Sequence, residues 1–162
     1  MGYSFTSQYA SFYGLTNLQY FEMPSTITTI SQNCFRGCGN LFYNKYSDLT
    51  SADCYIHIFF NNIKFIKQGA FTNAGLQNIE LGRNLISIGD SAFKTLRGSN
   101  DKTIIIHSEI LDFEQCGTEI FEPTTVFKNT VKMPGNIIYE HDWVSKFTDD
   151  PDKLVVVLEQ LD

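Results

Sequence analysis

A ladder of apolar residues recurs three times along the chain, and it constrains the fold more than any other feature of the sequence. Each copy ends in a small residue followed by phenylalanine, and two aliphatic anchors precede that pair at fixed distances. Segments 18–35 and 76–93 are the clearest copies. A unit that recurs in this way is typical of a stack of structural repeats. The anchors and terminal pairs are Ile27, Ile30, Cys34 and Phe35; Ile63, Ile66, Ala70 and Phe71; and Leu85, Ile88, Ala92 and Phe93.

The spacing of the copies predicts one inserted loop. The second anchors Ile66 and Ile88 lie 22 residues apart, whereas Ile30 and Ile66 lie 36 residues apart. We place the additional residues in a loop at about 42–51. Incomplete copies flank the three, as a stack requires, because a terminal repeat has no neighbour to cover it. These are a partial copy at Phe12, Leu15 and Leu18, and a degenerate copy without its Ala-Phe step at Ile104, Ile106, Ile110 and Phe113.

The residues before each pair of anchors predict a β-strand with one buried face. Apolar and polar residues alternate around Ile79 and Leu81, as they do in a half-buried strand. Gly82 ends this stretch, and Pro24 stands at the same place in the first copy. One such unit cannot bury its apolar face alone, so the copies must share a continuous core. The phenylalanines of the three copies are therefore expected to stack in one column.

The string Leu-x-x-Ile-x-Leu-[Pro/Gly]-x-x-[Ile/Leu]-x-x-Ile-x-x-x-Ala-Phe-x-x-Cys resembles the BspA-type leucine-rich repeat over about residues 12–121. The resemblance implies a mainly-β or α/β repeat solenoid, a short right-handed leucine-rich-repeat stack with a parallel sheet on one side. It also implies adhesion or protein–protein contact, and it offers no catalytic motif. We therefore expect a solenoid at 1–121 and a C-terminal capping or interaction segment at 122–162.

The C-terminal segment carries signals for a strand, a turn and a closing cap. Residues 126–133 have strand character and precede the turn Pro134-Gly135. Residues 137–147 resemble the aromatic closing segment that follows such repeats. Asp150-Pro151 is a helix-start signal, but the run Leu154–Leu158 has β propensity. Helix and strand are both open for the last stretch.

The composition excludes several classes of function. The net charge is −6 and the pI is about 5.0, so no basic face is available for phosphates, and we expect no nucleic-acid binding. No apolar run reaches the roughly 18 residues of a membrane helix, and the N-terminus shows no signal peptide. We expect the chain to be cytoplasmic, virion-associated or part of an exported assembly.

The cysteines and histidines do not have the spacing of a chemical site. The four cysteines lack CxxC or zinc-finger spacing, and we interpret them as small core residues. Cys34 and Cys54 replace the alanine and leucine of sister copies, so both are expected to be buried and reduced. Cys54 and His57 lie three residues apart, which places them on opposite faces of a strand. We expect no metal, no cofactor and no catalytic residue, and an enzyme is the most distant alternative.

The outward side of the expected strands is the candidate partner-binding surface. Glu22 and Glu80 are polar, as solvent-facing positions should be, whereas Ile58 and Ile105 at the same offset are apolar. Exposed apolar patches usually mark contacts, so we expect a partner, a second copy, the inserted loop or the C-terminal segment to cover them. The equivalent outward positions are Tyr20 and Glu22, Ile56 and Ile58, Asn78 and Glu80, and Thr103 and Ile105.

Two classes of function are open at this point. The first is a recognition module that binds a protein or a glycan through the exposed sheet face. The second is a structural protein of a larger assembly, such as a phage virion or tail, which includes self-assembly. The absence of a visible signal peptide and the aromatic, Asn-rich character favour the second class weakly. The aliphatic outward positions fit both.

Overall fold

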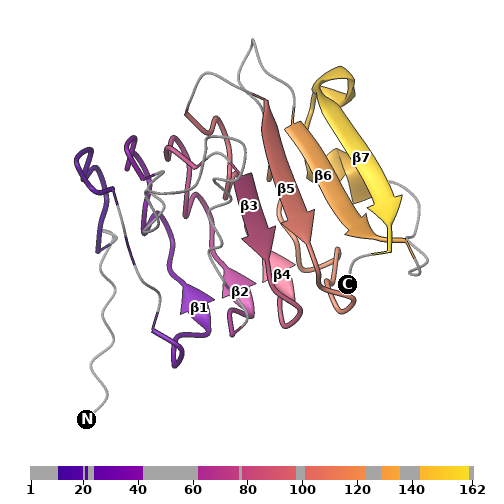
Figure 1. Cartoon of the computed structure of the whole chain (residues 1–162), viewed down its shortest axis with the longest axis horizontal. Coiled ribbons are helices and arrows are strands. Elements are labelled where there is room, and N and C mark those ends of the chain that lie inside the picture. Colours follow the sequence, from indigo (N-terminus) through magenta and orange to yellow (C-terminus); the bar gives the residue numbers. More distant parts are fainter. Residues whose placement is uncertain are drawn as a thin grey trace, which may run out of the picture.

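The described part of the chain is a stack of β-strands, tight turns and two short 3-10 helices (Figure 1). The computed structural model describes residues 11–19, 21, 24–41, 62–76, 78–97, 101–122, 129–135 and 143–160. Its elements are β1 (Thr29–Ile30), β2 (Phe65–Ile66), β3 (Asn78–Leu81), β4 (Ser87–Ile88), β5 (Lys102–Ile106), β6 (Asn129–Pro134), η1 (Trp143–Lys146), η2 (Pro151–Lys153) and β7 (Leu154–Glu159).

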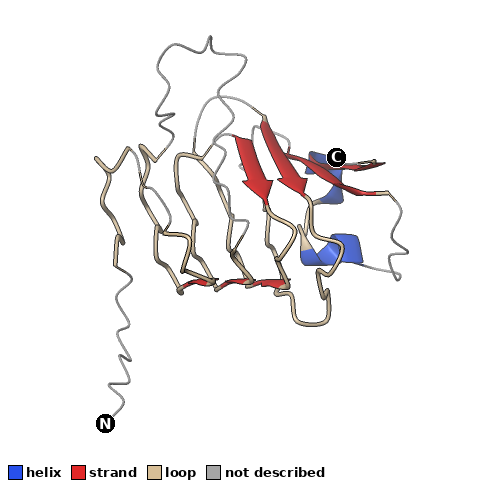
Figure 2. Cartoon of the chain, turned by 60° about the horizontal axis from the view of Figure 1, so that its bottom comes forward, coloured by secondary structure: helices blue, strands red, loops and turns tan. Residues whose placement is uncertain are grey.

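The strands form two parallel sheets on two sides of the stack. A four-stranded sheet has the order β3-β5-β6-β7, and a sheet of two-residue strands has the order β1-β2-β4. Every strand is parallel to its neighbour, because the chain returns to the same side once per turn. Figure 2 shows the short strands along one edge and the longer strands on another side. The longer sheet is the one that the repeat pattern predicts, and the shorter sheet, which contains the second anchors, is an addition to it.

The apolar positions of the repeat stand in register across the turns. Ile30, Ile66 and Ile88 are paired neighbours in β1, β2 and β4, and each is buried. In β5 the alternation of the sequence becomes an alternation of burial. Ile104 is buried against the core, while Ile105 faces outward and is half-buried. The period-two pattern of the sequence is therefore a true sheet pattern.

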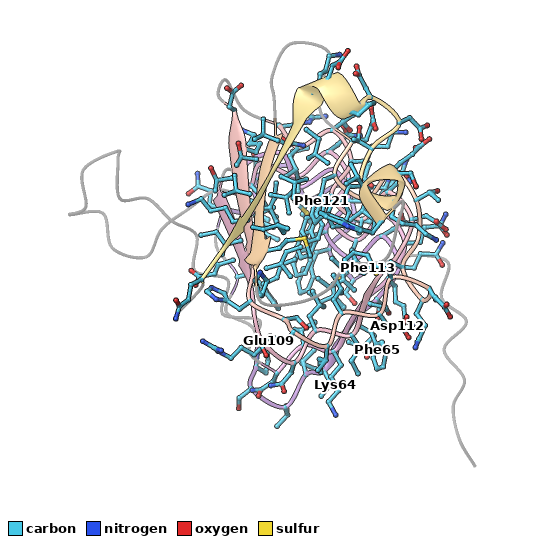
Figure 3. The ribbon with its side chains drawn as sticks, turned by 90° about the vertical axis from the view of Figure 1, so that its right-hand side faces the viewer. Lys64, Phe65, Glu109, Asp112, Phe113 and Phe121 are labelled. Atoms are coloured by element: carbon cyan, nitrogen blue, oxygen red, sulfur yellow. The ribbon has the colours of Figure 1, made fainter. Side chains whose placement is uncertain are left out.

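The phenylalanines stack in one column, as the repeat predicts. The ring centroids of Phe35 and Phe71, and those of Phe71 and Phe93, lie 5.2 Å apart in nearly parallel planes. Phe12 extends the column at one end at 5.1 Å from Phe35, and Phe121 extends it at the other at 5.4 Å from Phe93. Figure 3, viewed along the stack, places Phe121 inside it. The partial N-terminal copy is thus a turn of the same stack.

The prediction that the degenerate copy lacks its Ala-Phe step is wrong, because the turn after Phe93 contains an equivalent step. The amide of Phe93 donates to the carbonyl of Ile120 at 2.9 Å, in the way that earlier phenylalanine amides donate to the small residue of the next turn. Ile120 and Phe121 therefore occupy the step, and buried Cys116 stands at the place of the second anchor. A search with fixed spacing does not find this step, because this turn is longer than the preceding one. Cys116 lies ten residues after the end of β5, whereas the anchor Ile88 of β4 lies seven residues after the end of β3.

Each tight turn around Phe35, Phe71 and Phe93 contains two residues with positive φ, two positions before and two positions after the ring, and one such residue is described for Phe12 and for Phe121. Glycine and asparagine adopt this left-handed conformation most readily, which explains why they recur there. Backbone hydrogen bonds also join these turns along the stack, such as that from the amide of Gly69 to the carbonyl of Asp90 at 2.9 Å. The left-handed residues before the ring are Asn33, Gly69, Ser91 and Glu119, and those after it are Gly14, Gly37, Asn73 and Thr95.

Residues after 121 add two strands to the four-stranded sheet. β6 pairs with β5, and β7 pairs with β6. The strand expected at 126–133 is present from Asn129 onward, whereas 123–128 lie outside the described residues. The Asp150-Pro151 signal produces only the short helix η2, without a side-chain cap hydrogen bond, and the following run forms β7. Both alternatives left open by the sequence therefore occur, one after the other.

Aromatic side chains cover the end of the core at this last turn. The ring of Phe147 stands edge-on to Phe121 at 5.0 Å, and Trp143 stands edge-on to Phe147 at 5.4 Å. Phe113 packs against Trp143 at 5.6 Å, which joins the preceding turn to the same cluster. Polar contacts fix this turn as well, since the Thr148 hydroxyl donates to a carboxylate oxygen of Glu122 at 2.7 Å. The last ring of the column is thereby shielded from solvent.

The described cysteines are free thiols with different surroundings. Cys38 and Cys116 are buried, whereas Cys34 is only half-buried, which corrects the prediction that it is buried. Cys34 stands near the N-terminal end of the described stack, where it is covered less completely than Ala70 and Ala92 at the same step of later turns. Desolvation raises the pKa of all three thiols. Cys54 and the loop expected at 42–51 lie outside the described residues.

Candidate protein-binding face

The candidate site is the side of the four-stranded sheet that points away from the core, here called the outward face. Parallel pairing places its residues in two rows across the strands. One row contains Asn78, Thr103, Thr130 and Val155, and the other contains Glu80, Ile105, Lys132 and Val157. Neighbouring strands lie about 4.8 Å apart, so the side chains of one row can be covered by a single partner.

The structure describes three of the predicted site side chains, and it brings them together. Thr103 is the β5 neighbour of Asn78, and Ile105 is the β5 neighbour of Glu80, as the repeat alignment predicts. Glu80, Thr103 and Ile105 are all half-buried on the outward face. For Asn78 only the strand position is described. The other predicted positions, Tyr20, Glu22, Ile56 and Ile58, lie outside the described residues.

His107 belongs to this site, and the sequence alignment does not identify it. Its Nε2 lies 2.6 Å from Oε1 of Glu80, across a separation of 27 residues. His107 directly follows β5 and stands two residues after Ile105, so both side chains are on the outward face. The available signal was this period of two combined with the pairing of Glu80 and Ile105, because diagonal neighbours on one face of a sheet can reach each other.

The outward face becomes more apolar towards β7. The row that begins with Glu80 continues through Ile105 and Lys132 to Val157. In the other row Val155 is 46% exposed. The described part of the face therefore mixes aliphatic side chains with a few hydrogen-bonding groups. The ionisable side chains described on this face are Lys132 and the Glu80–His107 pair.

The side of the shorter sheet offers less surface for a binding partner. Its outermost aromatic, Phe65, is half-buried and lies under Nζ of Lys67 at 5.1 Å from the ring centroid. Figure 3 shows Lys64 and Phe65 at the outer edge of the stack, far from the column ring Phe121. Strands of two residues provide a narrow surface, and an ammonium group already covers part of the ring. The outward face of the longer sheet is the better candidate.

Within the described residues, no group of three or more His, Cys, Asp or Glu side chains could hold a metal ion. The described segments also contain no helix with the length and apolar character needed to cross a membrane.

Comparison with known families agrees with the geometry of the turns. The family described as BspA type leucine rich repeat region, with six copies, matches residues 6–115 and 42–140. The chain belongs to the BspA-type leucine-rich repeat family. The matched BspA-type region includes β3 and β5 and ends after β6. No curated protein and no solved structure matches the chain significantly.

Proposed function

We propose that this BspA-type repeat chain is a non-enzymatic module that holds a protein partner on its outward face. Proteins of the leucine-rich repeat class are in general binding modules, which supports the class of function. One observation supports the location. Ile105 lies on the outward face between Glu80 and Lys132, so an aliphatic side chain stands in the middle of a regular row that contains charged groups at both sides.

The chemistry of the face supports a protein as the occupant. Covering an isoleucine removes apolar surface from water, and full burial contributes about 1.5–3 kcal/mol. Glu80 and His107 are held together at 2.6 Å beside it, so a partner meets a fixed polar pair instead of two mobile side chains. A preorganised pair costs less conformational entropy on binding. Aliphatic contact at the centre with polar groups around it is the usual anatomy of a protein interface.

Ile105→Glu tests this proposal. The variant places a carboxylate in the middle of the face, and desolvating this charge under a partner is costly even beside the ammonium group of Lys132. We expect its affinity for the protein bound by the wild-type chain to fall at least about tenfold, measured by isothermal titration calorimetry. Ile110→Glu is the matched control, because Ile110 is 57% exposed and lies outside the face. It is expected to bind like the wild type.

The outcomes of this experiment are distinct. Equal binding by both variants would show that the outward face is not the site. A fall in thermal stability with Ile105→Glu, and not with Ile110→Glu, would show that this chain covers its own face. Binding to purified glycans without any protein partner would replace the proposed class of partner. Adhesion to a surface and incorporation into a larger assembly such as a virion are the two settings in which a protein-binding face of this kind would act.

A further inference from the structure

β7 is the last strand of the four-stranded sheet, and one of its two edges is unpaired among the described residues (Figure 1). Its core-facing residue Leu158 is 49% exposed, although its β6 neighbour Met133 in the same row is fully buried. Val155, on the outward face, is 46% exposed. At this edge no described strand pairs with the backbone of β7, and aliphatic side chains are open to solvent.

This edge lacks the features that usually prevent pairing with another chain. Natural edge strands are blunted by charged residues, proline, bulges or short length. The five residues 154–158 contain no charged residue and no proline, and β7 pairs with β6 over six consecutive residues without a bulge. Although β7 ends in Glu159, a regular edge with five consecutive apolar residues is a template for an added strand.

The sequence of β7 matches itself in the opposite direction. Residues 154–158 read Leu-Val-Val-Val-Leu from either end, with Val156 at the centre. If two copies pair antiparallel with Val156 on the two-fold axis, Leu154 lies opposite Leu158 of the partner subunit. Val155 then lies opposite Val157 of the partner subunit. Directly opposite residues of an antiparallel pair are on the same face, so each side chain meets one of its own kind.

We infer that β7 pairs with β7 of a second copy of this chain, so that two four-stranded sheets become one continuous sheet in a two-fold dimer. A two-fold axis perpendicular to the sheet keeps both core sides together, so Leu158 is covered by the partner subunit's Leu154. It also places the two outward faces side by side. The interface is isologous and closes after two copies, which gives a dimer and not a fibre. This inference goes beyond the proposed binding function, and the dimer forms whether or not another protein is bound to the outward face.

Charge substitutions at Val155 and Val157 test the pairing and its register. Val155→Lys/Val157→Lys places lysine opposite lysine, and Val155→Glu/Val157→Glu places glutamate opposite glutamate. We expect each variant to dimerise at least about tenfold more weakly than the wild type, because like charges directly opposite are destabilising. A mixture of the two variants is expected to form a one-to-one heterodimer. Masses are measured by sedimentation equilibrium with a reductant, which excludes disulfide-linked dimers.

Val155→Lys/Val157→Glu is the matched control. It carries charges at the same two positions, but the proposed register places each lysine opposite a glutamate, so this variant is expected to dimerise by itself. Circular dichroism checks that every variant is folded. A monomeric wild type overturns the inference, as does a wild type that forms open-ended polymers. A mixture that stays monomeric, or a control as weak as the lysine pair, overturns the register and with it the two-fold arrangement.

Discussion

Lys102 is a lysine at a core-facing position of a strand. It is the first residue of β5, it pairs with Asn129 of β6, which pairs in turn with Leu154 of β7, and it is 3% exposed. The side-chain amide of Asn129 has its own hydrogen-bond acceptor, because its Nδ2 donates to the carbonyl of Phe121 at 2.6 Å. Nζ of Lys102 has no hydrogen-bond partner within the part of the chain that the structure describes. Desolvation lowers the pKa of this ammonium group, and nearby Asp101 only partly opposes the shift.

Lys102→Met is expected to stabilise the fold at neutral pH. The change keeps an unbranched side chain and removes a buried polar group, whose lack of a partner costs on the order of 1–3 kcal/mol. The free energy of unfolding is measured by denaturant titration. Because the folded-state pKa is below the unfolded one, the unfolded chain binds more protons between the two values, and wild-type stability rises with pH there. The advantage of the variant should therefore shrink at alkaline pH. An advantage that does not change with pH would contradict this account.

At the scale of the element, each of the tight turns around Phe35, Phe71 and Phe93 contains two left-handed residues. Thr95 has a φ of 52° in the position that Gly37 and Asn73 occupy in the preceding turns. A β-branched residue is strained in this conformation, whereas asparagine tolerates it. The Thr95 hydroxyl donates to Oδ1 of Asn73 at 2.7 Å, so a polar side chain is also useful at this place.

Thr95→Asn is therefore expected to raise the free energy of unfolding by about 0.5–1 kcal/mol, since it relieves the strain and keeps a hydrogen-bonding group next to Asn73. Thr103→Asn is the matched control, because Thr103 lies in the extended strand β5, where threonine is favoured and asparagine is not. The control should lower the stability. Thermal melts of the two variants should move in opposite directions, and a common direction would show that strain at Thr95 is not the cause.

The ring column is the element that joins every turn. Phe71 is 1% exposed and has a parallel ring at 5.2 Å on each side. Phe71→Ala removes both ring contacts and leaves a cavity, so we expect a loss of about 3–5 kcal/mol in the free energy of unfolding. Phe12→Ala is the comparison, because Phe12 stands at the end of the column and is only half-buried. Equal losses in chemical denaturation would argue against a shared column.

At the scale of the whole molecule, fixed spacing predicts the stack because each turn repeats one buried pattern. The Phe column, the register of β3 with β5 and the aromatic cover at Trp143 all follow from local sequence. Contacts between turns of unequal length do not, which is why the fourth Ala-Phe step requires the structure. The contact of His107 with Glu80 could have been found from the predicted register of β3 with β5 and the period of two along β5. The two-residue strands are also too short to carry a period of their own, so the second sheet has no separate sequence signal.

The distance between layers of the ring column does not depend on the number of residues in a turn. Phe35 and Phe71 are separated by 36 residues and Phe71 and Phe93 by 22, yet both pairs of rings stack at 5.2 Å. The longer turn adds chain without changing the distance between layers, and closing a longer loop costs free energy only logarithmically. Insertions between layers are therefore nearly neutral for this architecture. A stack of this kind can acquire new loops, and with them new recognition sequences, while its axial repeat stays constant.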